Sequence, residues 1–170
     1  FGAFATLGMD GIVIKHLVKD DENRDLLLGT AFTLKLLGAM VAVFIISIVT
    51  VTTSNDNKDV IIITIIASSL VFQSLNVIDF YFQSIVLSRY IVIVNLISQL
   101  VVSLIRIALI LAEAPLITFA YVILFDAVIL AVGYIYVYKH KNLSFRQWNF
   151  NKQTASELLK YSWPLAISGI

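Results

Sequence analysis

Residues 91–111 form an apolar stretch in which four of the polar side chains follow a helical spacing: Asn95, Gln99, Ser103 and Arg106. At about 100° per residue on a helical wheel, the other three fall within about 80° of Asn95, so all four share one narrow face. The rest of this helix surface is mostly Ile, Leu and Val. A guanidinium pairs well with phosphate through two parallel hydrogen bonds. The spacing therefore predicts a polar face that lines a cavity and meets an anionic group.

Four more ionisable residues interrupt apolar stretches elsewhere in the chain: Asp10, Lys35, Asp79 and Asp126. A charge within a membrane span costs at least a few kcal/mol, so it normally has a partner or a function. Positions along the predicted helices place Arg106 and Asp126 within roughly 7 Å of each other in depth, which predicts an outer ion pair. Lys35, Asp79 and Asp10 fall in the opposite half of the membrane and form a predicted inner group.

Three interpretations of these charges stay open. In the first, they are structural ion pairs that fix the rotation and register of the helices. In the second, they line a central cavity, where Arg106 and Lys35 meet an anionic headgroup and the carboxylates of Asp10, Asp79 and Asp126 bind a coupling cation, H+ or Na+. In the third, a charge lies at a membrane interface because the boundaries of the predicted spans are shifted.

The sequence contains no pattern typical of a catalytic or metal site. It has no Ser/His/Asp set, no Gly-rich phosphate loop and no cysteine, which excludes disulfides and thiolate metal ligands. His16 and His140 each lie beside lysines at span ends, where solvation explains them better than metal binding does. We therefore expect a protein that is not an enzyme and has no cofactor, no metal and no nucleic-acid partner.

The elements that must position these side chains are membrane-spanning helices. Hydrophobic residues make up 59% of the chain and charged residues only 14%, and the mean hydropathy is +0.93, whereas soluble domains are about a quarter charged. A span needs about 20 apolar residues. The sequence predicts an all-α, polytopic transmembrane bundle in a single domain, with about five spans and the start of a sixth. The predicted spans are residues 1–14, 26–51, 60–82, 91–111 and 116–138, and the sixth begins at 161–170.

Basic residues in the connecting loops predict an orientation. Nine of the 12 Lys and Arg residues fall in loops on one side of the predicted membrane, whereas Lys58 alone falls on the other. Because basic loops stay in the cytoplasm, residues 15–25, the turn around Arg89 and residues 139–160 are predicted to be cytoplasmic. The nine are Lys15, Lys19, Arg24, Arg89, Lys139, Lys141, Arg146, Lys152 and Lys160.

Three local patterns add detail. Thr154 and Glu157 have the T-x-x-E spacing of a capping box, which predicts a helix start at about residue 155. Tyr134, Tyr136 and Tyr138 at the end of the fifth span predict an interfacial aromatic belt. The chain begins without Met and both of its ends lie within apolar runs, so we expect it to be a piece of a longer protein.

Residues 7–39, 76–90 and 145–170 resemble the bacterial polysaccharide-biosynthesis, or O-antigen flippase, family. This family belongs to the multidrug/oligosaccharidyl-lipid/polysaccharide exporter superfamily. The resembling stretches include LGMDGIVIKHLVKDDENRD, NVIDFYFQSIVLSRY and FRQWNFNKQTASELLKYSWP, which occur in the order and spacing that the family shows.

The resemblance implies a transporter of about 12 to 14 helices in two bundles around a central cationic cavity, of which this chain is most of the first half. It implies flipping of undecaprenyl-pyrophosphate-linked oligosaccharide repeat units from the inner to the outer leaflet of the bacterial inner membrane, by alternating access. These units build surface polysaccharide, such as the O-antigen of lipopolysaccharide, capsule or exopolysaccharide. The implied partners are the lipid-linked oligosaccharide, membrane lipids, a coupling H+ or Na+, and polysaccharide polymerase machinery.

Four other functions can be compared with the charges and loops of the sequence. A drug/cation antiporter of the same superfamily favours an acidic cavity, and Arg106 and Lys35 argue against it. A flippase for lipid-linked peptidoglycan precursors fits the same charges. A membrane polysaccharide polymerase needs a large extracytoplasmic loop, whereas both predicted outer loops are short. A membrane scaffold needs no polar face across the bilayer.

Overall fold

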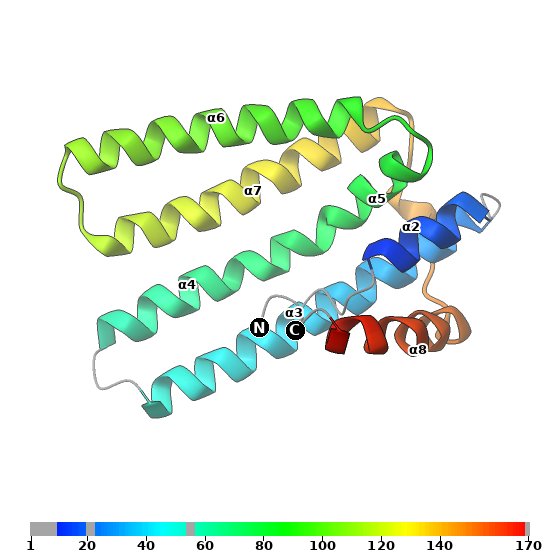
Figure 1. The fold of residues 1–170 in the computed structure, drawn as a ribbon, viewed down its shortest axis with the longest axis horizontal. Helices are drawn as coiled ribbons and strands as arrows, with labels where there is room; N and C mark the ends of the chain where they lie inside the picture. The colour runs from blue at the N-terminus through cyan, green and yellow to red at the C-terminus, as the bar shows by residue number, and fades with distance from the viewer. Residues whose placement is uncertain (1–9, 20–22, 54–56, 169–170) are drawn as a thin grey trace.

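The chain is helical apart from short turns in the part that the computed structural model describes, residues 10–19, 23–53 and 57–168 (Figure 1). No strand occurs within these ranges, and the predicted all-α class is confirmed. Two short 3-10 turns, η1 (Ser74–Asn76) and η2 (Phe145–Gln147), interrupt the α-helices. In chain order the α-helices are α2 (Asp10–Lys19), α3 (Arg24–Thr53), α4 (Asn57–Gln73), α5 (Val77–Ser84), α6 (Arg89–Leu111), α7 (Leu116–His140) and α8 (Lys152–Ser168).

Four helical segments within the described ranges are long and apolar enough to cross a membrane. Each lies within two residues, at both ends, of a span predicted from the sequence. The second of them is not one continuous α-helix, because the η1 turn joins α4 to α5 within it. The four segments are Arg24–Thr53, Lys58–Ser84, Arg89–Leu111 and Leu116–His140. The chain is therefore part of a polytopic helical bundle.

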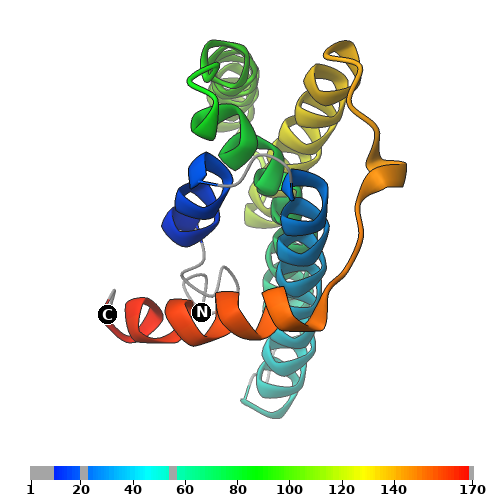
Figure 2. The ribbon, with the colours of Figure 1, turned by 90° about the vertical axis from the view of Figure 1, so that its right-hand side faces the viewer.

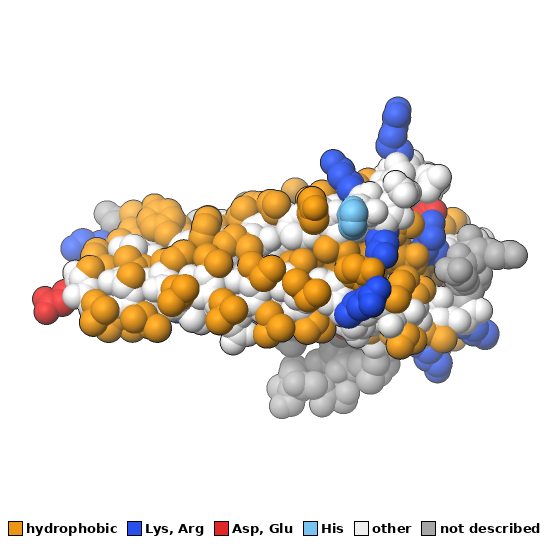
Figure 3. Space-filling view, turned by 90° about the horizontal axis from the view of Figure 1, so that it is seen from above, with side chains coloured by type: hydrophobic (Ala, Val, Ile, Leu, Met, Phe, Trp, Pro, Cys, Tyr) orange, Lys and Arg blue, Asp and Glu red, His pale blue; other side chains and the backbone are white. Residues whose placement is uncertain are grey.

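The four long helices pack in the spatial order α3, α4, α7, α6 (Figure 1). Because each outer helix packs against only one other long helix, large side chains stay exposed along the row, as Phe44 of α3 and Leu104 of α6 do. Figure 3 shows hydrophobic side chains along most of its length and Lys and Arg gathered at the end where α6 begins. This is the surface of a protein whose solvent is lipid over the middle and water at the end.

The best-packed core lies at this same end of the molecule, where α2, α3, α5 and α7 meet. Val13, Leu28, Ile78, Phe82 and Tyr138, from those four helices, are all fully buried within it. α2 packs against α5 and α3, and α8 lies across α3, as Figure 2 shows. The core fixes the start of α3 relative to the ends of α5 and α7.

The loop between α7 and α8 is held directly against α3. A Cβ atom at Gly29 would lie 2.7 Å from the backbone N and O atoms of Asn149, so only glycine permits this approach. One residue further along α3, the fully buried Thr30 hydroxyl accepts a hydrogen bond of 3.1 Å from the backbone N–H of Asn151. The small residue and its polar neighbour therefore attach the loop backbone to the first turns of α3.

Aromatic side chains also hold the same loop in place. The Trp148 indole N–H donates a 2.8 Å hydrogen bond to the Tyr138 hydroxyl at the end of α7. The Trp148 ring also packs against Phe145, with ring centroids 5.0 Å apart, and against Phe32 of α3, at 5.4 Å. Aromatic pairs at such distances are favourable beyond their burial alone.

The predicted boundary between the first span and the loop at residues 15–25 is wrong. The loop is shorter, because α2 continues to Lys19. Val13 and Leu17 lie one turn apart on the buried face of α2, while Lys15 and Lys19 are exposed. Residues 20–22 of that loop, and residues 1–9 of the first predicted span, lie outside the described part.

The predicted capping box is also wrong. α8 begins at Lys152, because the side-chain oxygen of Asn151 accepts hydrogen bonds from the backbone N–H groups of Gln153, at 2.8 Å, and Thr154, at 3.3 Å. Asparagine is at least as good an N-cap as threonine. The helix therefore starts three residues before the position that the T-x-x-E pattern indicates.

In the described part of the chain, three helices end with a non-glycine residue in the left-handed region. The φ angles are 57° at Val86, 50° at Glu113 and 57° at Asn142. In each case the following N–H bonds back to a carbonyl five residues earlier, as in Leu87 to Phe82 at 2.9 Å. This is the Schellman motif, in which glycine is usual. It satisfies carbonyls at the ends of α5, α6 and α7.

Candidate functional site

The polar face of α6 opens onto a pocket of about 450 Å³ between α6 and α7. All four residues of the predicted stripe line it, together with the predicted Asp126 of the neighbouring helix. The lining residues are Asn95, Ser98, Gln99, Val102, Ser103, Arg106, Asp126, Leu130 and Tyr134. A helix face predicted from periodicity thus becomes one wall of a polar hollow.

Two hydrogen bonds join the walls of this pocket. The Ser98 hydroxyl donates to Oδ1 of Asp126 at 2.6 Å, and the Tyr134 hydroxyl donates to Oδ1 of Asn95 at 2.9 Å. Both bonds run between α6 and α7 within membrane-spanning segments, where an unsatisfied polar group is expensive. They fix the rotation of α6 relative to α7.

Gly133 brings the two helices close enough for these bonds. A Cβ atom at this position would collide with the side chain of Val94 on α6. Small residues at helix crossings allow this kind of close approach in membranes. The pocket therefore opens beyond a tight contact near the start of α6.

The predicted ion pair between Arg106 and Asp126 does not form. Asp126 lies level with Ser98, and Arg106 is eight residues further along α6, which corresponds to about 12 Å. The Arg106 side chain is exposed and takes part in neither ion pair of the described residues. Gln99 and Ser103 are likewise exposed on the wall between. The pocket is thus lined by the Arg106 guanidinium at its far end and by the Asp126 carboxylate nearer the start of α6.

A second hollow between α6 and α7 is apolar. It has a volume of about 460 Å³ and is lined by hydrophobic residues and one tyrosine: Ile105, Tyr121, Val122, Leu124, Phe125 and Val128. The two hollows therefore suit different surroundings. The apolar hollow suits lipid tails or further helices, and the polar pocket suits a water-containing cavity.

The predicted inner group forms a second cluster, on α2, α3 and α5. Lys35 Nζ lies 2.8 Å from Oδ1 of Asp10 and 4.2 Å from the ring centroid of Phe80. Asp79, next to Phe80, is close enough to interact electrostatically with both Lys35 and Asp10. The Lys35 side chain is only 5% exposed, so it is enclosed in this cluster and does not line the α6–α7 pocket. Of the two predicted anion-binding cations, Arg106 alone reaches the pocket.

Tyr134 connects the two clusters. It hydrogen-bonds to Asn95 and lies within electrostatic range of both Asp79 and Asp126. The predicted aromatic belt at this end of α7 is therefore wrong for Tyr134 and Tyr138, which are 4% and 0% exposed; Tyr136, at 70%, fits it. Residues 134 and 138 are one helical turn apart and share the packed face, whereas residue 136 points the other way.

Ser98 and Tyr134 were not among the predicted site residues. On the helical wheel, Ser98 falls about 60° from Asn95 on the side away from Gln99, so a slightly wider stripe includes it. Nothing in the local sequence separates Tyr134 from the neighbouring tyrosines except its spacing. Within the described residues, no group of three His, Cys, Asp or Glu side chains is placed to hold a metal ion.

Comparison with known proteins gives one family match. The family model described as polysaccharide biosynthesis protein matches residues 1–170, the whole of the chain. No curated protein and no solved structure matches it.

Proposed function

Because this chain belongs to the polysaccharide biosynthesis protein family, we propose that it is the first-bundle part of a lipid-linked oligosaccharide flippase. In this proposal the protein moves an undecaprenyl-pyrophosphate-linked repeat unit from the inner to the outer leaflet of the bacterial inner membrane. It works by alternating access, with a second bundle closing the polar side of α6 and α7. It catalyses no covalent chemistry, and a polysaccharide polymerase uses its product.

One observation carries the proposal: Arg106 stands at the far end of a polar pocket within a membrane span and is in no ion pair of the described residues. A charge in hydrocarbon needs a partner. A pyrophosphate group offers several oxygens that match the planar guanidinium fork. Gln99 and Ser103, exposed on the same wall, supply donors for sugar or phosphate oxygens along the path.

The proposed orientation places residues 15–25, Arg89 and residues 139–160 in the cytoplasm. The clustering of Lys and Arg at one end of the row supports this orientation (Figure 3). Arg106 then lies in the outer half of the membrane. The pocket would draw the headgroup across from the cytoplasmic side toward this charge.

The test is complementation with the full-length gene in a bacterium that lacks its own polysaccharide flippase and makes the matching repeat unit. Surface polysaccharide is scored and membrane abundance is measured by blot. Wild type restores surface polysaccharide. Arg106→Ala reduces it about tenfold or more at equal abundance, since hydrogen bonds to charged groups contribute about 1.5–3 kcal/mol. Arg146→Ala, which removes an exposed arginine from the loop after α7, serves as the matched control and leaves the level unchanged.

Failure of a well-inserted wild type to rescue with its own sugar overturns the flippase proposal. Full activity of Arg106→Ala keeps the function but removes Arg106 from the pathway. Arg106→Lys discriminates further, because a lysine retains the charge but not the bidentate geometry. Partial rescue by this variant supports recognition of phosphate by the planar guanidinium.

A second function, drug/cation antiport, is favoured by the environment of Asp126. Its carboxylate lines the pocket, and its hydrogen-bond partner there is the neutral Ser98 hydroxyl rather than a cation. Such a carboxylate is available for a proton or a cationic substrate. Efflux of a cationic dye that depends on Asp126 and is indifferent to Arg106→Ala would favour the antiporter over the flippase.

A further inference from the structure

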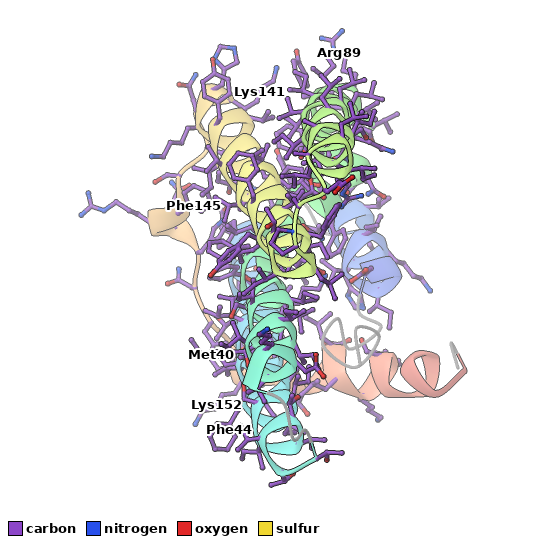
Figure 4. All side chains as sticks on the ribbon, turned by 90° about the vertical axis from the view of Figure 1, so that its left-hand side faces the viewer. Met40, Phe44, Arg89, Lys141, Phe145 and Lys152 are labelled. Atoms are coloured by element: carbon purple, nitrogen blue, oxygen red, sulfur yellow. The ribbon has the colours of Figure 1, made fainter. Side chains whose placement is uncertain are left out.

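Two cations share a single phenol at the end of the row where α6 begins and α7 ends. An Arg89 guanidinium nitrogen donates to the Tyr90 hydroxyl at 2.8 Å, and Lys141 Nζ donates to the same oxygen at 3.0 Å. The charges also lie near the Tyr90 ring, with 4.8 Å and 4.1 Å to its centroid. Arg89 and Lys141 both lie at the top of Figure 4, at the start of α6 and just after α7. Residues from the first and the last part of the α6–α7 hairpin thus converge at its open end.

This arrangement lacks a negative charge. A neutral phenol accepts two hydrogen bonds but neutralises neither cation. The ion pairs between residues of the described ranges, Arg24–Asp25 and Lys35–Asp10, include neither Arg89 nor Lys141. The two cations are nevertheless less than about 6 Å apart, because both contact one oxygen. Arg89 is also the first residue of α6, where the helix dipole adds to the positive potential.

Hydrogen-bond donors are in surplus at this cluster. A guanidinium has five N–H donors and an ammonium has three, and each of these groups spends one bond on Tyr90. A phosphate group supplies what is missing, namely negative charge and several acceptor oxygens. Its unesterified oxygens can accept from a guanidinium and an ammonium at the same time.

The position of the cluster selects the kind of phosphate. Arg89 and Lys141 lie at the ends of two membrane-spanning segments, the level at which lipid headgroups lie. Val86, in the turn before Arg89, is 88% exposed and offers an apolar surface beside the charges. An amphipathic tyrosine is typical of this interface.

We propose that Arg89, Tyr90 and Lys141 form a binding site for the phosphate of an anionic phospholipid headgroup. Tyr90 positions the two cations, and the cations bind the phosphate oxygens. The site lies at the end of the row remote from Arg106, and two of its residues, Arg89 and Tyr90, belong to the same helix as Arg106. It does not depend on which substrate the transporter carries.

The experiment uses the full-length protein, delipidated in a neutral detergent and titrated with phosphatidylglycerol or phosphatidylcholine under native mass spectrometry. Wild type binds phosphatidylglycerol at least tenfold more tightly than phosphatidylcholine. Lys141→Gln and Arg89→Gln each weaken phosphatidylglycerol binding about tenfold, because each variant loses a charge-assisted hydrogen bond to the phosphate. Tyr90→Phe keeps the ring and the fold but removes the shared oxygen, and it weakens binding by a smaller factor.

Lys139→Gln is the matched control. Lys139 is exposed, lies two residues before Lys141 and carries the same charge, whereas the hydrogen bonds to the Tyr90 hydroxyl come from Arg89 and Lys141. It should change the affinity less than twofold. Equal losses in Lys139→Gln and Lys141→Gln would overturn the proposal, since they indicate diffuse attraction rather than a site. Absence of a preference for phosphatidylglycerol would overturn it as well.

A separate arm distinguishes a lipid from a soluble phosphate. Inorganic phosphate and pyrophosphate are added at millimolar concentration to the lipid-loaded protein. Retention of phosphatidylglycerol supports a membrane lipid as the ligand. Displacement by pyrophosphate with the same dependence on Arg89 and Lys141 would reassign the site to a soluble or substrate phosphate and overturn the lipid assignment.

Discussion

Lys35 and Asp10 form an ion pair of 2.8 Å whose two members are very unequally exposed. The Lys35 side chain is 5% exposed, whereas the Asp10 side chain is 49% exposed. The pair joins α2 to α3 beside the ring of Phe80. Because of this difference in exposure, we expect substitution of Lys35 and substitution of Asp10 to change stability by different amounts.

Removing the aspartate should destabilise the protein more than removing the lysine. Asp10→Asn leaves a buried ammonium with a weakened partner, and leaving a buried polar group poorly paired costs about 1–3 kcal/mol. Lys35→Met leaves a half-exposed carboxylate and fills the site with an apolar chain of similar length, at a cost below about 1 kcal/mol. Thermal unfolding of the detergent-purified full-length protein measures both. Lys139→Met, at an exposed position, is the control, and equal effects of Asp10→Asn and Lys35→Met would contradict the prediction.

The bond between Ser98 and Asp126 should contribute to the packing of α6 against α7. Ser98→Ala removes the hydroxyl that donates to the carboxylate at 2.6 Å, and this should lower the free energy of unfolding by about 1–3 kcal/mol. Ser103→Ala, on the exposed part of the same face, should change it by less than about 0.5 kcal/mol. Chemical unfolding followed by tryptophan fluorescence compares the two. A larger loss in Ser103→Ala would show that Ser98 does not hold the hairpin together.

Val86→Gly should stabilise the protein. A β-branched residue at φ 57° is strained, and its exposed side chain gives up little burial when removed. The expected gain is about 1 kcal/mol, because the left-handed conformation costs roughly 1–2 kcal/mol and glycine recovers most of this. Asn142→Gly is the matched substitution at an equivalent helix end, where asparagine already tolerates the conformation. A melting temperature that rises for Asn142→Gly but not for Val86→Gly would contradict the strain argument.

Gly29→Ala should displace the loop between α7 and α8. The new methyl group would meet the backbone of Asn149 at 2.7 Å, and backbone cannot swing aside as a flexible side chain can. We expect a loss of about 2 kcal/mol or more, in the range of overpacked cores. Gly11→Ala provides the control, because a Cβ there meets nothing within 4 Å, and the change should stabilise α2 by up to about 1 kcal/mol. Limited proteolysis in the loop reports its release from α3, and a loop equally protected in both variants would refute the prediction.

The membrane spans could be predicted from the sequence because hydropathy accumulates over about 20 residues, so that an error at one position matters little. The polar stripe of α6 could be predicted for a related reason: residues on one helix face are set by local periodicity alone. Lys35 and Asp10 could be grouped because both fall in the same half of the membrane. These features depend on one helix at a time, or on depth only.

Contacts between helices were harder to predict. The expected pairing of Arg106 with Asp126 rested on span boundaries, but the register of α7 against α6 is set by the contact of Gly133 with Val94. A shift of a few residues along an antiparallel neighbour moves a side chain by several ångströms. The start of α8 was misplaced for another reason, because Asn151 and Thr154 both have capping chemistry and only the tertiary fold selects between them.

The attachment of the loop between α7 and α8 has a mechanical consequence. Thr30 and Gly29 hold its backbone on α3, and Trp148 hydrogen-bonds to Tyr138 at the end of α7. The start of α8 is thereby joined directly to the first turns of α3. A displacement of α8 would be passed to the base of α3, within two helical turns of the buried Lys35, rather than taken up by the loop.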